Sequence, residues 1–251
     1  MSETLPGEVD DAGGARRLDA LWLDFRGIAR LLAVTAVILA VVGAVVNVVI
    51  YQVIGDPEAD VARVLARFDL GHEPSVPAWF SSGLLLINAT MLLLLGRAAR
   101  GARAPFALHW TALGLVFVAL SADEAALFHE MVDTFLSRKL ETDGVLTFPW
   151  VIAGSAFAAL VALLYLPFLL HLPRRFALLF VLSGALFVGG AVGMELFSAI
   201  AIDRHGIASL AHAATQTIEE SMEMAGSILF FLSLSRYWTH TYGDVRLGIR
   251  A

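Results

Sequence analysis

Residues 31–54 read LLAVTAVILAVVGAVVNVVIYQVI, a run of 24 residues without a charged side chain. As a helix this run is about 36 Å long, whereas the apolar core of a bilayer is about 30 Å thick. The run therefore predicts a transmembrane helix. Further apolar segments of spanning length follow at residues 78–96, 106–130, 148–172, 176–202 and 210–235. We expect an all-α, polytopic membrane protein with six transmembrane helices.

Arginine and lysine are unevenly distributed between the two sides of these helices. With the N-terminus in the cytoplasm, 12 of the 17 basic residues lie on the cytoplasmic side, as the positive-inside rule requires. We therefore expect both termini in the cytoplasm and the protein in the bacterial inner membrane. The regions expected along the chain are a disordered tail over 1–15, an amphipathic surface helix over 16–30, a membrane domain over 31–238 and a cytoplasmic tail over 239–251.

The composition excludes several classes of protein. Of the 251 residues, 58% are hydrophobic and only 16% are charged, which a soluble enzyme rarely shows. The net charge of −6 argues against a nucleic-acid partner, because a polyanion needs a basic surface. The absence of cysteine excludes disulfides, thiolate metal sites and cysteine nucleophiles. The lipid bilayer is the partner that remains, and the pattern is compatible with a homo-oligomer.

Acidic residues interrupt three of the expected spans. An ionisable side chain there costs about 2.5–3.5 kcal/mol on insertion scales, so it marks a functional site by default. Only 12 residues separate Glu223 from Arg236, too few to cross a bilayer, so the last span must include the glutamates that precede Glu223. The acidic residues at membrane level are Asp123, Glu124, Glu130, Glu195, Glu219, Glu220 and Glu223.

The acidic residues of all three helices fall in the outer half of the membrane. At about 100° per residue, Asp123 and Glu130 lie within about 20° of each other on the third helix. On the fifth helix, the small residues on the side of Glu195 predict close packing of a neighbouring helix there, and they are Gly184, Ala191, Ser198 and Ala199. The sixth helix carries one polar stripe, made of His212, Gln216, Glu219 and Glu223. We expect the three helices to direct their acids to one place.

The expected spans contain no lysine or arginine to neutralise these carboxylates. Seven neighbouring carboxylates cannot all ionise, so either several are protonated or a cation is bound. Imidazole with carboxylate suits iron, manganese or zinc, and carboxylates alone also suit calcium or magnesium. Glu220 is the expected general base if the metal activates water or oxygen against a lipid-soluble substrate. The predicted ligands of a divalent metal ion are Asp123, Glu124, His129, Glu130, Glu195, His212, Glu219 and Glu223.

Other interpretations of the same residues stay open at the level of sequence. A proton- or cation-coupled transporter would use the glutamates to load and release its ion, and a non-catalytic assembly or sensor protein would turn them toward lipid or a partner. Protonated Glu219, Glu220 and Glu223 could also serve only to join helices. Asp123 and Glu130 could mark a hydrated helix end without a role.

Two acidic segments carry a resemblance to a known group. Residues 120–130, which read LSADEAALFHE, and residues 217–226, which read TIEESMEMAG, resemble a group of bacterial multi-pass membrane proteins, as do residues 76–82, VPAWFSS. The resemblance covers most of the membrane region. It implies that these segments belong together, and it implies no activity, substrate or cofactor.

Overall fold

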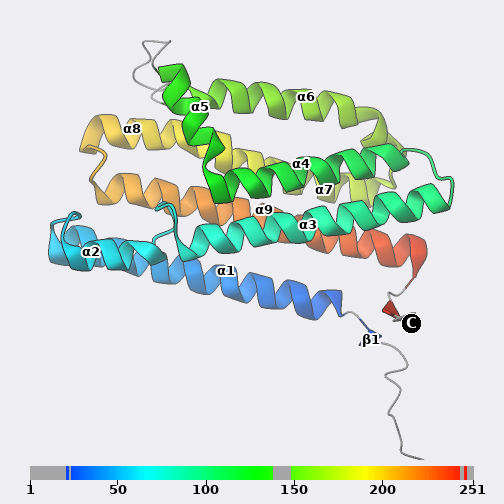
Figure 1. Cartoon of the computed structure of the whole chain (residues 1–251), viewed down its shortest axis with the longest axis horizontal. Coiled ribbons are helices and arrows are strands. Elements are labelled where there is room, and N and C mark those ends of the chain that lie inside the picture. Colours follow the sequence, from blue (N-terminus) through cyan, green and yellow to red (C-terminus); the bar gives the residue numbers. More distant parts are fainter. Residues whose placement is uncertain (1–20, 23, 138–147, 244–245, 248–251) are drawn as a thin grey trace, which may run out of the picture.

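The computed structural model describes residues 21–22, 24–137, 148–243 and 246–247 (Figure 1). A short antiparallel pairing joins β1 (Leu21–Trp22) to β2 (Arg246–Leu247). Almost all other described residues are helical, so the all-α prediction is confirmed. The helices are α1 (Phe25–Val48), the π-helix η1 (Val49–Ile54), α2 (Asp60–Leu65), the 3-10 helix η2 (Ala66–Phe68), α3 (Val76–Gly101), α4 (Ala107–Ala126), α5 (Phe128–Ser137), α6 (Trp150–His171), α7 (Arg174–Val188), the π-helix η4 (Gly189–Met194), α8 (Glu195–His205) and α9 (Leu210–Tyr242).

Several of these helices are apolar and long enough to cross a membrane. In the described part of the chain, four segments qualify, and a fifth is added if the bent pair of α4 and α5 counts as one span. α9 is not among them, and its first half carries Glu219, Glu220 and Glu223. Six spans and the orientation of the termini stay predictions. The four segments are Phe25–Ile54, Val76–Gly101, Trp150–His171 and Arg174–His205.

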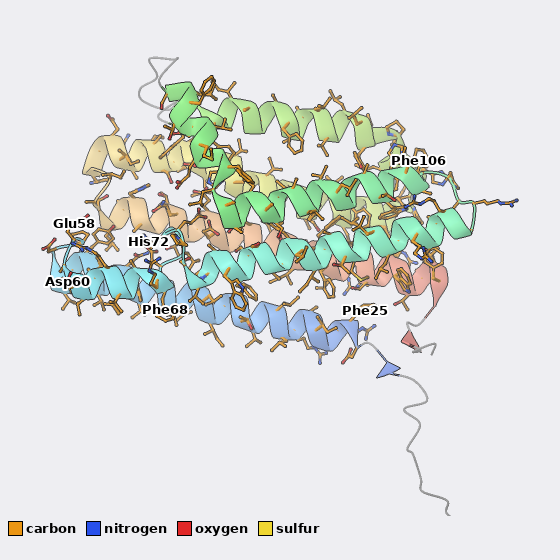
Figure 2. The ribbon with its side chains drawn as sticks, viewed as in Figure 1. Phe25, Glu58, Asp60, Phe68, His72 and Phe106 are labelled. Carbon is orange, nitrogen blue, oxygen red and sulfur yellow. The ribbon has the colours of Figure 1, made fainter. Side chains whose placement is uncertain are left out.

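The long helix α9 is the centre of the bundle, and it packs against α1, α3, α7, η4 and α8. α3 and α4 form a hairpin beside it (Figure 1). Glu58, Asp60, Phe68 and His72 lie toward one end of the bundle, and Phe25 and Phe106 lie toward the other (Figure 2). We call these the carboxylate end and the aromatic end.

The aromatic end holds the largest core cluster of the described residues. The Trp110 ring lies 4.7 Å from the Phe168 ring and 5.0 Å from the Tyr237 ring, measured between centroids, so α4, α6 and α9 meet there. Leu92 and Leu95 of α3 are fully buried in the same cluster. Dense packing of this kind is what holds helices together when lipid surrounds them.

The chain enters the bundle differently from the expected surface helix over 16–30. Residues 16–20 lie outside the described residues, and Leu21–Trp22 form β1. α1 then begins at Phe25, where the Asp24 side chain accepts a hydrogen bond from the Arg26 N–H. This cap starts the helix, and the helix continues directly into the first span. A separate helix ending at residue 30 is therefore wrong for the described residues.

The expected helix over 106–130 is broken. α4 ends at Ala126, Leu127 adopts a left-handed conformation with φ 58°, and α5 leaves at an angle of 73°. The Asp123 carboxylate accepts a hydrogen bond from the His129 N–H at 2.8 Å, which caps the first turn of α5. The predicted alignment of Asp123 with Glu130 is wrong, because the two residues lie on different helices, on either side of the break at Leu127.

The fifth expected span also departs from regular α-helix. The glycine-rich π-helix η4 separates α7 from α8 and shifts the helical phase. A Cβ at Gly190 would lie 2.9 Å from the Glu219 carbonyl oxygen, so this glycine lets η4 approach α9. A Cβ at Gly184 would meet nothing within 4 Å. Gly190 is therefore a small residue that allows close packing beside the acids, and the expected contact at Gly184 is wrong. Ser198 and Ala199, predicted on the same side as Glu195, are each 1% exposed, as close packing requires.

Candidate functional site

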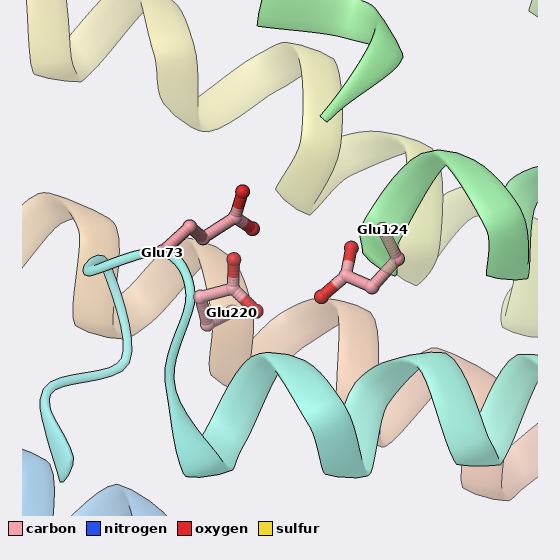
Figure 3. A group of neighbouring side chains, drawn as sticks. All are labelled: Glu73, Glu124 and Glu220. Atoms are coloured by element: carbon pink, nitrogen blue, oxygen red, sulfur yellow. The ribbon is translucent and has the colours of Figure 1, made fainter. Parts of the chain in front are cut away.

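Three carboxylates meet at the carboxylate end of the bundle. Glu73 comes from the loop before α3, Glu124 from α4 and Glu220 from α9. One oxygen of each lies within 4.8 Å of the others, and the three side chains converge from these separate segments (Figure 3). Among the described residues this is the group that has the geometry to hold a metal ion. We call it the glutamate triad.

Each member of the glutamate triad has an unsatisfied oxygen. Oε2 of Glu73, Oε1 of Glu124 and Oε2 of Glu220 are buried and have no hydrogen-bond partner among the described residues. A buried polar atom without a partner is costly, and native structures contain few of them. Three such atoms on carboxylates that converge therefore point to a proton or a cation among them.

Glu73 is held in place by a hydrogen-bonded loop. The buried Asp69 carboxylate accepts hydrogen bonds from the Asn47 Nδ2 at 2.8 Å and from the Gly71 N–H at 3.3 Å. The Gln216 side chain of α9 donates to the Gly71 carbonyl at 3.4 Å. These contacts tie the loop to α1 and α9 and bring Glu73 close to Glu124 and Glu220.

Burial raises the pKa of Glu73 to about 7, His129 opposes this shift, and the nearby Glu130 and Asp123 carboxylates add to it. Burial also raises the pKa of Asp69, although hydrogen bonds from Asn47 and Gly71 favour its charged form. The loop therefore carries two carboxyl groups that ionise less readily than they would in water. Glu73 is the one that faces other acids.

The triad adjoins a polar cavity of about 340 Å³. Its described lining contains no lysine or arginine, so the counter-charge is as scarce as the sequence predicts. The buried His212 has an Nδ1 atom without a partner among the described residues. The predicted residues that line the cavity are His129, Glu130, Glu195, His212, Glu219 and Glu220.

Asp123 and His129 form a pair at the edge of this cavity. The Asp123 Oδ2 lies 3.1 Å from the His129 Nδ1, in addition to the bond from the His129 backbone. Such a carboxylate fixes the orientation of the imidazole and leaves its Nε2 for other contacts. The His129 ring also lies 5.5 Å from the Trp150 ring, whose Nε1 donates to Glu195 at 3.0 Å.

The structure thus brings the predicted residues to one end of the bundle, where they have different partners. Glu124 and Glu220 belong to the triad, Asp123 is engaged by His129, and Glu195 is engaged by Trp150. Glu223 faces η4, where its Cγ would be 3.0 Å from a Cβ on Gly190. The prediction that acids of three helices gather agrees with this arrangement.

Glu73 is the residue that sequence reasoning missed. It lies outside every apolar segment, in a loop that also contains Asp56, Glu58 and Asp69. Periodicity says nothing about such a position, and an acidic residue in a loop is ordinarily hydrated. The one available signal was its place just before α3, on the side where the other acids collect.

The chain belongs to a family of unknown function. The model of the domain of unknown function DUF8692 matches residues 31–238, which include the triad and the cavity. No curated protein and no solved structure matches the chain. Any function must therefore be argued from the site itself.

Proposed function

We propose that this protein is a bacterial inner-membrane protein that binds a divalent metal ion between Glu73, Glu124 and Glu220. The observation that carries the proposal is the convergence of three carboxylates with buried, unpartnered oxygens. A dication would neutralise the negative charge of these carboxylates, for which the described lining of the cavity provides no lysine or arginine. It would also supply the missing partner to each oxygen.

The all-carboxylate composition of the triad favours a hard cation. Two ligands on opposite sides of one ion are at most twice the metal–oxygen distance apart, which is about 4.6–5.2 Å for calcium and about 4.0–4.2 Å for magnesium. Three ligands around one ion lie closer together than this limit, so oxygens within 4.8 Å of one another suit either ion once the side chains close on it. Among iron, manganese and zinc, manganese is best suited to carboxylates.

The surroundings of the triad support a metalloenzyme that acts on a lipid-soluble substrate. The paired Asp123 and His129 lie at the edge of the cavity, which is the arrangement of an oriented general base. We assign the role of base to His129, because Glu220 is part of the triad. His212, with its unpartnered Nδ1, is a further ligand candidate.

A cation carrier is less well supported. It needs polar groups along the whole path, and the aromatic end is filled by the Trp110, Phe168 and Phe231 core. Asn88, midway along α3, is buried and donates to the carbonyls of Leu84 and Ser227, so it ties α3 to α9. Toward the aromatic end the polar lining of the cavity therefore gives way to an apolar core, which suits a binding site better than a carrier.

Metal analysis of the detergent-purified protein tests the proposal. We expect a near-stoichiometric divalent metal after equilibration with Mn²⁺ and gel filtration. The Glu73→Gln, Glu124→Gln, Glu220→Gln triple variant should lose it, and Glu58→Gln, at an exposed glutamate near Arg63, should keep it. Wild-type protein that is folded, yet retains no more metal than the triple variant, would overturn the proposal.

A further inference from the structure

A second, apolar cleft lies beside the polar cavity. It has a volume of about 850 Å³ and runs between α4, α6, α7 and α9. It exists because α6 stands away from the bundle: only Val151 and Phe168 of that helix are buried. The cleft reaches the surface, since the lining residues Phe157, Val181 and Val188 are 47%, 53% and 38% exposed. In a membrane this opening faces the acyl chains.

The cleft is long and polar mainly at one end. Along α6 its lining extends from Trp150 to Phe168, a distance of about 27 Å at the helical rise. At the Trp150 end it includes Asp123 and His129, and both His129 and Trp150 also line the polar cavity. At the other end the Tyr165 hydroxyl is engaged, because it donates to the His109 carbonyl at 2.8 Å. This shape matches an amphiphile with one apolar chain and a head group near the triad.

The charges at the polar end restrict the head group. None of the described residues that line either space is a lysine or an arginine, whereas six carboxylates line the polar cavity and Asp123 lines the cleft. An anionic head group would meet repulsion there, and a hydroxyl or ammonium group would find acceptors. The electrostatics therefore select against fatty acids and for cationic or neutral amphiphiles.

We propose that this cleft binds the chain of a long-chain amine from the bilayer and places its head group at the Asp123–His129 pair. The proposal names the substrate class of the metal site and rests on the proposed function for any chemistry that follows. Binding itself depends on the cleft and is measured separately from the metal.

Equilibrium binding of radiolabelled hexadecylamine to the full chain in nonionic detergent tests the inference. We expect saturable binding of about one molecule per chain at pH 7, where an alkyl ammonium is charged. Hexadecanoate, with a chain of the same length, should bind at least tenfold more weakly. Equal, non-saturable uptake of both compounds would overturn the proposal.

A matched pair of glycine variants locates the bound chain. Gly184 lines the cleft and Gly83 does not, and a Cβ at either position meets nothing within 4 Å. Gly184→Leu should weaken hexadecylamine binding at least tenfold, while Gly83→Leu should leave it unchanged. Equal binding by the two variants would also overturn the assignment.

Metal content separates this proposal from the previous one. Gly184→Leu should retain its metal, because Gly184 is not part of the triad. Saturable, cleft-dependent amine binding by a protein that never holds metal would refute the metal site and leave the cleft assignment standing. Metal binding without selective amine binding would refute the cleft assignment and leave the metal site standing.

Discussion

The two ends of the bundle differ in how completely their buried polar groups are hydrogen-bonded. At the aromatic end they are paired: the hydroxyls of Ser233 and Ser235 donate to the carbonyls of Leu229 and Phe231 one turn earlier. At the carboxylate end, buried oxygens of the glutamate triad have no partner among the described residues. The aromatic end therefore stabilises the fold, whereas the carboxylate end costs stability that a bound cation would return.

The strongest test of this contrast is a deletion at the aromatic end. Trp110→Ala removes a 3% exposed ring that contacts Phe168 and Phe180, and we expect it to lower the free energy of unfolding by about 3–5 kcal/mol. Trp79→Ala, at a 77% exposed ring, is the control. Denaturation in mixed detergent measures both. Comparable losses in the two variants would mean that the aromatic cluster is not the stabilising core.

Single substitutions at the carboxylate end should act on the ion rather than on the fold. Glu73→Gln is expected to weaken Mn²⁺ binding at least about 100-fold, or 2.7 kcal/mol, because it removes a ligand. Glu219→Gln, next to the triad in the chain but outside it, should cost about tenfold. Titration followed by electron paramagnetic resonance measures both constants. A larger loss for Glu219→Gln would place the ion elsewhere in the cavity.

Two buried asparagines separate positioning from general stability. Asn47→Ala leaves Asp69 without its 2.8 Å donor and frees the loop of Glu73, so we expect about tenfold weaker metal binding and a stability loss of about 1–3 kcal/mol. Asn88→Ala breaks hydrogen bonds to the carbonyls of Leu84 and Ser227. It should lower stability and leave metal affinity unchanged. Thermal unfolding and metal titration of both variants distinguish the roles. Equal metal affinity in the two variants would show that Asn47 does not position Glu73.

The smallest expected effect is a dependence of stability on pH. Because burial raises the pKa of Glu73 from 4.5 to about 7, the folded metal-free protein binds more protons than the unfolded chain between these values. Its stability should therefore fall as pH rises from about 4.5 to 7. In chelator-treated protein, Glu73→Gln should flatten this decline in a series of unfolding temperatures. An unchanged slope would show that Glu73 does not titrate in this range.

The metal adds a dependence of opposite sign. A carboxylate must lose its proton to bind a cation, so Mn²⁺ affinity should rise as pH increases through 7. Stability in the presence of excess Mn²⁺ should then increase over the range in which the metal-free protein weakens. A parallel decline with and without metal would contradict binding at Glu73.

Sequence patterns predicted the helices well where packing did not change their course. The apolar runs over 78–96 and 148–172 correspond to α3 and α6 because length and apolarity are local properties. The predicted directions of side chains around the helix axis failed at Leu127 and at the π-helix Gly189–Met194. A single break of this kind rotates every later side chain relative to the earlier ones. A side-chain cap and a tight helix contact cause these breaks, and neither is visible as periodicity.

By itself, the sequence determined that the chain is helical, that it is apolar enough for a membrane and that its acids collect toward one end. These properties follow from composition and from the order of apolar and charged segments. Only the tertiary structure decided which carboxylates meet. Glu73 reaches Glu124 and Glu220 because Asn47 holds Asp69, and because Gln216 holds Gly71 across 145 positions of the chain. Contacts between such distant residues depend on the packing of whole helices, which no local pattern contains.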